Sequence, residues 1–190
     1  NKNINTTFWE TNASITDDGQ TLYFTSNRKG GFGGLDIYRS RKDAQGDWGP
    51  AENLGSEINT PYNEESPFFI EKNNTLIFTS QGHENMGGYD IFVSKLGENG
   101  KFSTPINLGY PINSTDDDLF FCPTGDQGIE GVVFHQTGKG RNIKVNLAQI
   151  TLIPQTDKTT VNGQLITQDQ ADLSDTKPDI AVVNTNTGDT

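Results

Sequence analysis

The chain has 190 residues and a formal net charge of −11, from 14 basic and 25 acidic side chains. Because an acidic surface is repelled by phosphate backbones, nucleic acid is not expected as a partner. Hydrophobic residues make up only 31%, and no run approaches the roughly 20 apolar residues of a membrane-spanning helix, whereas 21 glycines suit an all-β chain with many tight turns.

The first predicted elements are four short strands that alternate with turn signals. Asp17-Asp18-Gly19 predicts a hairpin turn, because glycine adopts positive φ without strain. A glycine-rich loop at residues 29–34 precedes the third strand, and Pro50 places the fourth at the edge of the sheet. The expected strands are residues 12–16, 21–26, 35–40 and 48–54.

A second unit repeats the first at a constant offset of 54 residues. Leu22–Ser26 recurs as Leu76–Ser80, and Gly33–Tyr38 recurs as Gly87–Phe92. Strand repeats with a period of about 40–50 residues are typical of propeller arrays. The second unit is expected to contain strands at residues 66–70, 75–80 and 89–94 and an outer segment from Phe102 to Gly109, in which Asn107-Leu108-Gly109 repeats Asn53-Leu54-Gly55.

The third unit is degenerate, and the chain changes character after it. Asp118–Pro123 resembles the start of a unit, Gly131–His135 its second strand, and Gly138–Ile143 the approach to its third strand. Residues 1–153 are therefore predicted to form a partial β-propeller of about two and a half four-stranded blades. Since a ring needs about 4–8 blades, we expect the chain to belong to a larger protein or to complete its sheets with other chains. Residues 156–190 are predicted to begin a truncated, immunoglobulin-like β-sandwich domain.

Residues that recur in both units are interpreted as framework. Asp36 and Asp90 share one position, where we expect them to accept backbone hydrogen bonds at a turn, because one catalytic site needs only one residue. Trp48 and Phe102 are expected to pack between neighbouring sheets. Cys122, the one cysteine, lies in an apolar run and is predicted to be a buried thiol.

These motifs resemble the WD-repeat-like β-propeller repeats of outer-membrane-protein-A-family envelope proteins of Bacteroidota. The resemblance covers about residues 8–150 and is carried by Asp18–Ser26, by Gly33–Tyr38 with its copy Gly87–Phe92, and by the Asn-Leu-Gly segments followed by Ile-Asn. The tail from Val161 to Gly188 resembles the opening of a carboxypeptidase-regulatory-like domain.

The resemblance implies a periplasmic position in the cell envelope, associated with the outer membrane. One branch of these proteins, the PorE-like proteins, belongs to the type 9 secretion and gliding machinery. The family is peptidoglycan-associated through a further domain that these 190 residues do not include, so peptidoglycan binding is not assigned to them.

The sequence contains no catalytic or cofactor-binding signature. It has no His-Glu-x-x-His or Gly-x-Ser-x-Gly motif, and Gly30–Gly34 lacks the Lys-Ser/Thr of a phosphate loop. We therefore expect a non-enzymatic protein–protein interaction scaffold without a cofactor, whose partners are envelope proteins contacted by loops that vary between units. The candidate contact residues are Arg28, Lys29, His83, Glu84 and Asn85.

Two alternatives remain open. One is a propeller-based hydrolase, or a sugar- or peptide-binding module, which would need polar groups from non-equivalent positions to converge on one pocket. The other is a calcium-stabilised structural spacer, because calcium prefers clustered carboxylates and Asp116, Asp117 and Asp118 are the best metal candidates.

Overall fold

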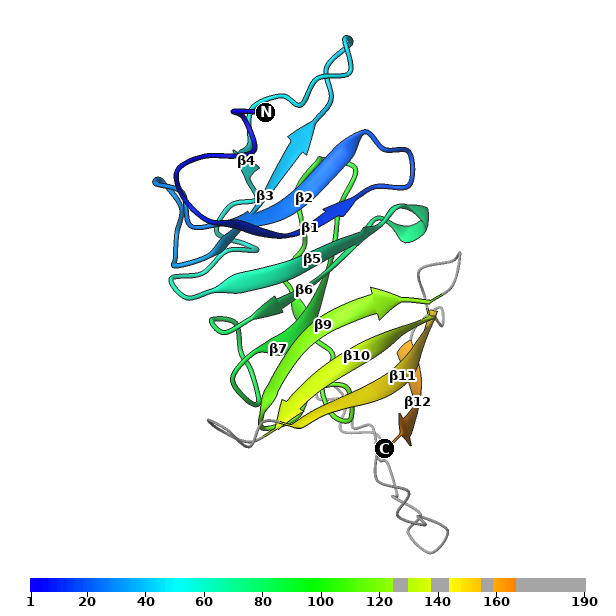
Figure 1. Ribbon diagram of the computed structural model, residues 1–190. Coiled ribbons are helices and arrows are strands. Elements are labelled where there is room, and N and C mark those ends of the chain that lie inside the picture. Colours follow the sequence, from blue (N-terminus) through cyan, green and yellow to red (C-terminus); the bar gives the residue numbers. More distant parts are fainter. Residues whose placement is uncertain (125–129, 138–143, 155–158, 167–190) are drawn as a thin grey trace, which may run out of the picture.

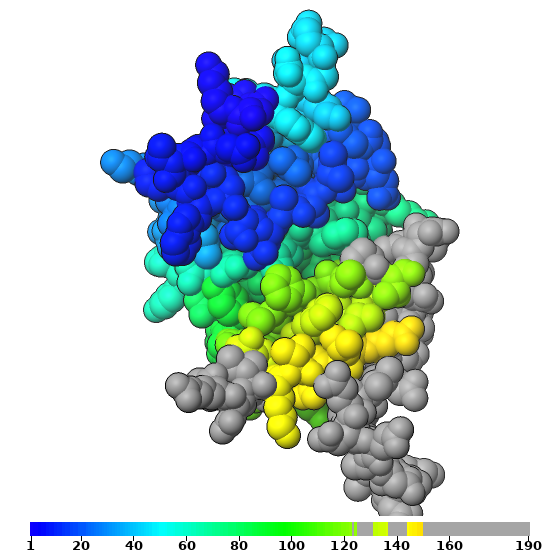
Figure 2. Space-filling view, in the orientation of Figure 1, coloured from blue at the N-terminus to red at the C-terminus, as the bar shows by residue number. Residues whose placement is uncertain are grey.

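A computed structural model describes residues 1–124, 130–137, 144–154 and 159–166 and shows an all-β chain of three antiparallel sheets (Figure 1). The sheets follow one another in chain order, so that the colours of Figure 2 pass in bands from blue to yellow. Within these described ranges the three sheets do not close into a ring. In the same ranges, no helix has the length and apolar character needed to cross a membrane.

The first sheet matches the predicted strand order and differs mainly at its outer strand. Its order is β1-β2-β3-β4, with β1 (Glu10–Ile15), β2 (Thr21–Ser26), β3 (Asp36–Arg41) and β4 (Glu52–Asn53). The predicted outer strand is reduced to two residues and a separate bridge between Lys42 and Trp48. Pro50, which has no N–H to donate, lies between these two pairings.

The second sheet copies the first, including its irregularities. Its order is β5-β6-β7-β8, with β5 (Glu64–Ile70), β6 (Thr75–Ser80), β7 (Asp90–Lys95) and β8 (Ile106–Asn107) and a short 3₁₀ helix at Glu71–Asn73. Asn12 and Ser66, 54 residues apart, both have positive φ, and the pairing register shifts around each of them. The repeat therefore specifies a β-bulge as well as the strands.

The third sheet is more complete than the degenerate motif predicted. Its order is β12-β11-β10-β9, with β9 (Asp117–Pro123), β10 (Glu130–Thr137), β11 (Lys144–Pro154) and β12 (Thr159–Ile166). β12 pairs with β11 along its length, although its residues fall in the predicted second domain. The rest of that domain, residues 156–158 and 167–190, and the glycine-rich segment 138–143 lie outside the described residues.

Two apolar clusters join the sheets face to face, one at each interface. Tyr23 and Ile37 of the first sheet contribute to the first cluster, and the residues 54 positions later, Ile77 and Ile91, contribute to the second. The second sheet thus packs one face against the first sheet and the other face against the third. The first cluster is Tyr23, Ile37, Ile58, Leu76, Phe78 and Phe92, and the second is Ile70, Ile77, Ile91, Ile112, Phe121 and Val133.

The far face of the third sheet is exposed and apolar. Phe120 and Leu147 are 41% and 42% exposed, and the ring of Phe120 meets that of Phe134 edge-on at 6.0 Å between centroids. Cys122 is exposed on this sheet, so the prediction of a buried thiol was wrong. The reason is alternation along β9, where the neighbouring Phe121 turns into the core at 7% exposure.

The two aromatic residues predicted to pack between sheets differ in their surroundings. Phe102 packs against the first cluster, with its ring edge-on to that of Phe69 at 6.5 Å. Trp48 holds the equivalent position in the first unit, where no described sheet lies beside it. Its ring instead contacts the ammonium of Lys42 at 5.0 Å.

Candidate functional site

Asp36 and Asp90 begin β3 and β7 and are almost fully buried, at 1% and 0% exposed. Asp36 accepts the backbone N–H groups of Phe32 at 2.6 Å and Gly33 at 2.9 Å. Asp90 accepts the N–H of Met86 at 2.6 Å. These bonds hold each loop against the strand that follows it, as the recurrence of the two carboxylates predicted.

A pair of asparagines extends each carboxylate into a buried network. Asn53 donates its amide to Asp36 at 2.7 Å and accepts from the amide of Asn59 at 2.9 Å. Asn59 also accepts from the Ile37 N–H at 2.7 Å and donates to the Ile37 carbonyl at 2.9 Å, so its side chain pairs with β3 as a further strand would. The second sheet repeats this network with Asp90, Asn107, Asn113 and Ile91.

A second set of carboxylates, which the sequence analysis missed, lies at the first or second residue of the first strand of each sheet. Glu64 accepts from the N–H of Thr60 at 2.7 Å and from its hydroxyl at 2.6 Å, and it is 0% exposed. Its equivalents bond in the same way to the residue four positions earlier. The signal is a triple alignment at the 54-residue offset, hidden by conservative exchanges: Thr6 with Glu10, Thr60 with Glu64, and Ser114 with Asp118.

The first two of these carboxyls have pKa values displaced in opposite directions. Burial acts to raise the pKa of Glu10, but hydrogen bonds from Thr6 and Ser26 and the charge of Arg28, 3.2 Å away, outweigh it and lower that pKa. For Glu64, burial dominates over its hydrogen bonds and raises the pKa.

Glu64 should therefore make stability depend on pH. A raised pKa in the folded chain means that folding takes up a proton, so this contribution is present below the ordinary glutamate value of about 4.3 and is lost as the pH rises through the folded value. Glu64→Gln removes the titration. We expect the free energy of unfolding of the wild type, relative to E64Q, to decrease with rising pH across that window, as measured by urea unfolding at a series of pH values.

The matched control for this experiment is Glu84→Gln. Glu84 is an exposed carboxyl in the loop that follows Ser80, the residue paired with Glu64. That variant should stay within about 0.5 kcal/mol of the wild type at each pH, as for most surface substitutions. A difference between the wild type and E64Q that stays constant with pH would contradict the prediction.

The third carboxylate has a different partner from the other two. In the first and second sheets a serine of the second strand, Ser26 or Ser80, donates to it at 3.0 and 2.8 Å. In the third sheet the Nδ1 atom of His135 bonds Asp118. The Nε2 atom of His135 is buried, and within the described residues no hydroxyl, thiol or carboxylate reaches it. The pair therefore joins β9 to β10, and none of the described residues completes a catalytic dyad with it as a nucleophile.

Two of the five predicted contact residues, Arg28 and His83, lie against aromatic rings of the chain, and a third, Asn85, donates its amide to the carbonyls of Gln81 and Gly88 at 3.1 Å. The guanidinium of Arg28 lies 4.9 Å from the ring centroids of Phe24 and Tyr38 and donates to two carbonyls of the N-terminal segment. His83 lies beside the equivalent aromatic pair of the second sheet, with its Nε2 atom 2.8 Å from the carbonyl oxygen of Ile58. Both side chains thus cover the end of an aromatic pair.

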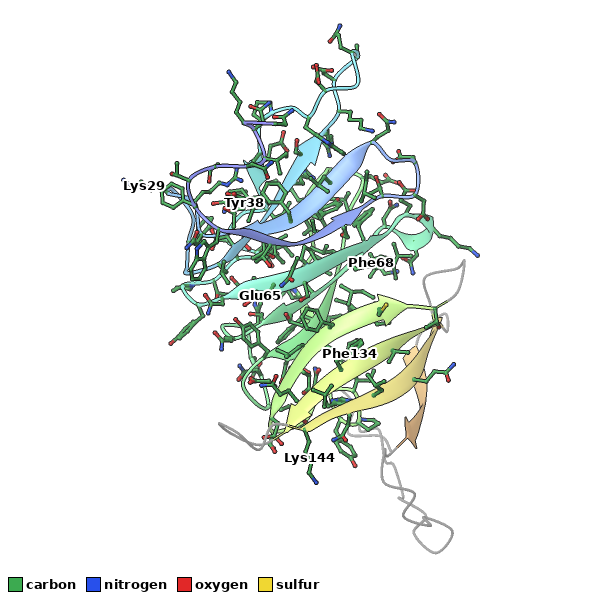
Figure 3. All side chains as sticks on the ribbon, viewed as in Figure 1. Lys29, Tyr38, Glu65, Phe68, Phe134 and Lys144 are labelled. Carbon is green, nitrogen blue, oxygen red and sulfur yellow. The ribbon has the colours of Figure 1, made fainter. Side chains whose placement is uncertain are left out.

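The other three predicted residues, Lys29, Glu84 and Asn85, are exposed. They belong to the loop rim, which we define as residues 27–35, 54–63, 81–89 and 108–116. Neighbouring loops of this rim are bonded to one another, for example by the N–H of Gly34 to the carbonyl of Tyr62 at 2.7 Å. Figure 3 labels Lys29 at the left, where these loops gather in Figure 1.

The loop rim also carries four exposed apolar side chains that were not predicted, one of which is Tyr110 at 64% exposed. Phe32 and Met86 occupy one position in the two units and are 50% and 45% exposed. Tyr62, from the connection between the two sheets, is 61% exposed. The alignment of Phe32 with Met86 was visible in the sequence, but the exposure of a loop side chain depends on neighbouring loops.

The three aspartates proposed as calcium ligands turn to different partners. Asp118 is bonded to Ser114 and His135, and Asp117 accepts the N–H of Tyr89 at 3.0 Å. Asp116 is exposed, and its carbonyl accepts the N–H of Gly88. No group of three or more His, Cys, Asp or Glu side chains in the described part of the chain is arranged to hold a metal ion.

In comparisons with known proteins, no family model, no curated protein and no solved structure matches this chain.

Proposed function

We propose that this chain is a non-enzymatic interaction scaffold of the bacterial cell envelope, built from blades of a β-propeller. One observation carries the proposal. The carboxylates best placed for chemistry, such as Asp36, Asp90 and Glu64, are buried and bonded to their own loops, and they recur from sheet to sheet. Side chains that do not recur, such as Lys29 and Glu84, are exposed on the loop rim, where a partner can reach them.

The blade assignment is supported by how the sheets pack. Each of the two interfaces buries one face of a sheet against the opposite face of the next, which is the arrangement of propeller blades. The third sheet presents Phe120, Val145 and Leu147 on a face with no described neighbour. Exposed apolar surface of this kind marks an interaction site, and we propose that further sheets from outside the described residues cover it.

The envelope assignment rests on the motif resemblance described above. On that basis we propose a periplasmic scaffold associated with the outer membrane, with other envelope proteins as partners and peptidoglycan contacted through a separate domain. A role in type 9 secretion or gliding, and a carboxypeptidase-regulatory-like domain at residues 156–190, belong to the same proposal. The calcium-spacer alternative has no group of three or more His, Cys, Asp or Glu side chains placed to hold a metal ion in the described ranges.

Site-specific photo-crosslinking in the native host tests the scaffold role. A photoreactive amino acid at Lys29, Glu84 or Asn85 should give crosslinks to defined envelope proteins, because these side chains are exposed on the loop rim. The matched control positions are Gln45 and Glu98, which are exposed in the loops at the opposite ends of the strands. Crosslinking of the same partners with equal yield from both sets would contradict a partner surface at the loop rim.

A further inference from the structure

A pocket of about 390 Å³ lies between the outer parts of the first two sheets. One wall comes from β3, β4 and the residues after β4, and the other from residues 100–102, which precede β8. A hydrogen bond from the Thr104 hydroxyl to the Glu57 carboxylate, at 2.6 Å, joins the two walls. The volume falls within the range of small-ligand sites, roughly 300–1,000 Å³.

Several polar residues that line this pocket differ between the two units, whereas the framework residues of the pocket recur. Leu54 is framework and recurs as Leu108. Asn53 likewise recurs as Asn107, but three other polar positions do not recur, since the second unit has apolar or aromatic residues there. Arg39, Ser56 and Glu57 are replaced, 54 positions later, by Val93, Tyr110 and Pro111. Side chains needed only for the fold would be expected at both interfaces, so the polar set at one interface indicates a task specific to it.

Two basic side chains of the pocket retain hydrogen-bonding capacity. Arg39 is bonded through Nε to Glu52 at 2.9 Å and also interacts with the hydroxyl of Tyr23, which leaves other N–H donors of its guanidinium free. Lys101 is exposed, and its ammonium has no partner among the described residues. Their charges are partly balanced by Glu57 within the pocket and by Glu52 beside it.

We propose that this pocket binds a peptide-like ligand that carries a single carboxylate. The carboxylate lies between Lys101 and Arg39, whose planar fork matches a carboxylate in geometry. N–H donors of the ligand face Glu57, and its apolar part contacts Leu54 and Phe102. The carboxylates of Glu52 and Glu57 disfavour the binding of a doubly charged anion such as phosphate, because like charges at this range repel. The inference goes beyond the scaffold proposal and does not depend on it.

The test is an NMR titration of the isotope-labelled 190-residue chain with three peptides and with inorganic phosphate. The peptides are acetyl-Ala-Leu-Ala with a free terminal carboxylate, its terminal amide, and acetyl-Ala-Asp-Ala amide, in which the carboxylate is on a side chain. We expect shifts of the Gly55, Ser56 and Lys101 amides with the first or the third peptide, and the stronger of the two identifies the source of the carboxylate. The neutral amide should bind at least about tenfold more weakly, which corresponds to ~1.4 kcal/mol.

Lys101→Ala and Arg39→Val should each weaken this binding by a similar factor, and Lys144→Ala, the loss of an exposed lysine of the third sheet, should not. Valine is the residue at the equivalent position of the second unit, and Lys101 is exposed, so both variants are expected to fold. Equal binding of the acid and amide peptides, tighter binding of phosphate, or K101A and R39V titrations equal to the wild type would each overturn the proposal.

Discussion

Phe78→Ala should destabilise the chain by about 3–5 kcal/mol, the range found when a fully buried phenylalanine is truncated. Phe78 is 0% exposed and belongs to the cluster that joins the first two sheets. Its ring stacks on Phe92 at 6.0 Å and meets the ring of His83 at 5.9 Å. The substitution therefore removes contacts within the second sheet and between sheets, and denaturant unfolding followed by fluorescence and circular dichroism should detect the loss.

The control for this variant is Phe32→Ala, at a side chain that is 50% exposed on the loop rim. Its free energy of unfolding should stay within about 0.5 kcal/mol of the wild type, as for most surface substitutions. If F78A and F32A were equally stable, the assignment of Phe78 to an interface between sheets would have to be abandoned.

Asn113→Ala should destabilise the chain by about 2–4 kcal/mol, because the asparagine side chain makes three hydrogen bonds in a site that is 0% exposed. It accepts from the Ile91 N–H at 2.8 Å and donates to the Ile91 carbonyl at 2.9 Å and to Asn107 at 2.6 Å. Truncation leaves the N–H of Ile91 buried without a partner, which costs more than an exposed hydrogen bond. Urea unfolding measures the loss directly.

Asn113→Asp tests the loss of the side-chain N–H donors without a change in side-chain volume. The carboxylate has nearly the same shape, but it has no N–H to donate to the Ile91 carbonyl or to Asn107, so N113D should be at least as unstable as N113A. Gln45→Ala, at an exposed amide in the turn after β3, is the surface control and should be close to the wild type. Wild-type stability of N113D would show that the network does not hold β7 in place.

Much of the framework could be predicted because it depends on neighbours in the sequence. The turn at Gly19 follows from the flanking strand patterns, and β2 and β6 match their predicted bounds. The recurrence of Asp36 and Asp90 indicated their hydrogen bonds to the loops before them. In each of these cases the partners lie within a few residues, so local chemistry decides the outcome.

Predictions failed, or remained incomplete, where the partner is distant in the chain. Cys122 was assigned to the core, but only the side of β9 that faces the second sheet is covered. Arg28 stays a predicted partner contact, but its sequence position did not show that two rings and the N-terminal segment contact its guanidinium. The acidic series from Glu10 to Asp118 was missed because the exchange of Glu for Asp weakens the match between units.

By itself, the sequence determined the all-β class, the 54-residue repeat and the loop bonds of Asp36 and Asp90, since these follow from short-range pairing and turn chemistry. Tertiary structure alone decided which face of each sheet is buried, which loops meet at the rim, and where a charged pocket opens between the first two sheets. The physical reason is that burial is a property of two surfaces in contact. A strand pattern describes one of these surfaces, and the chain must fold before the other lies against it.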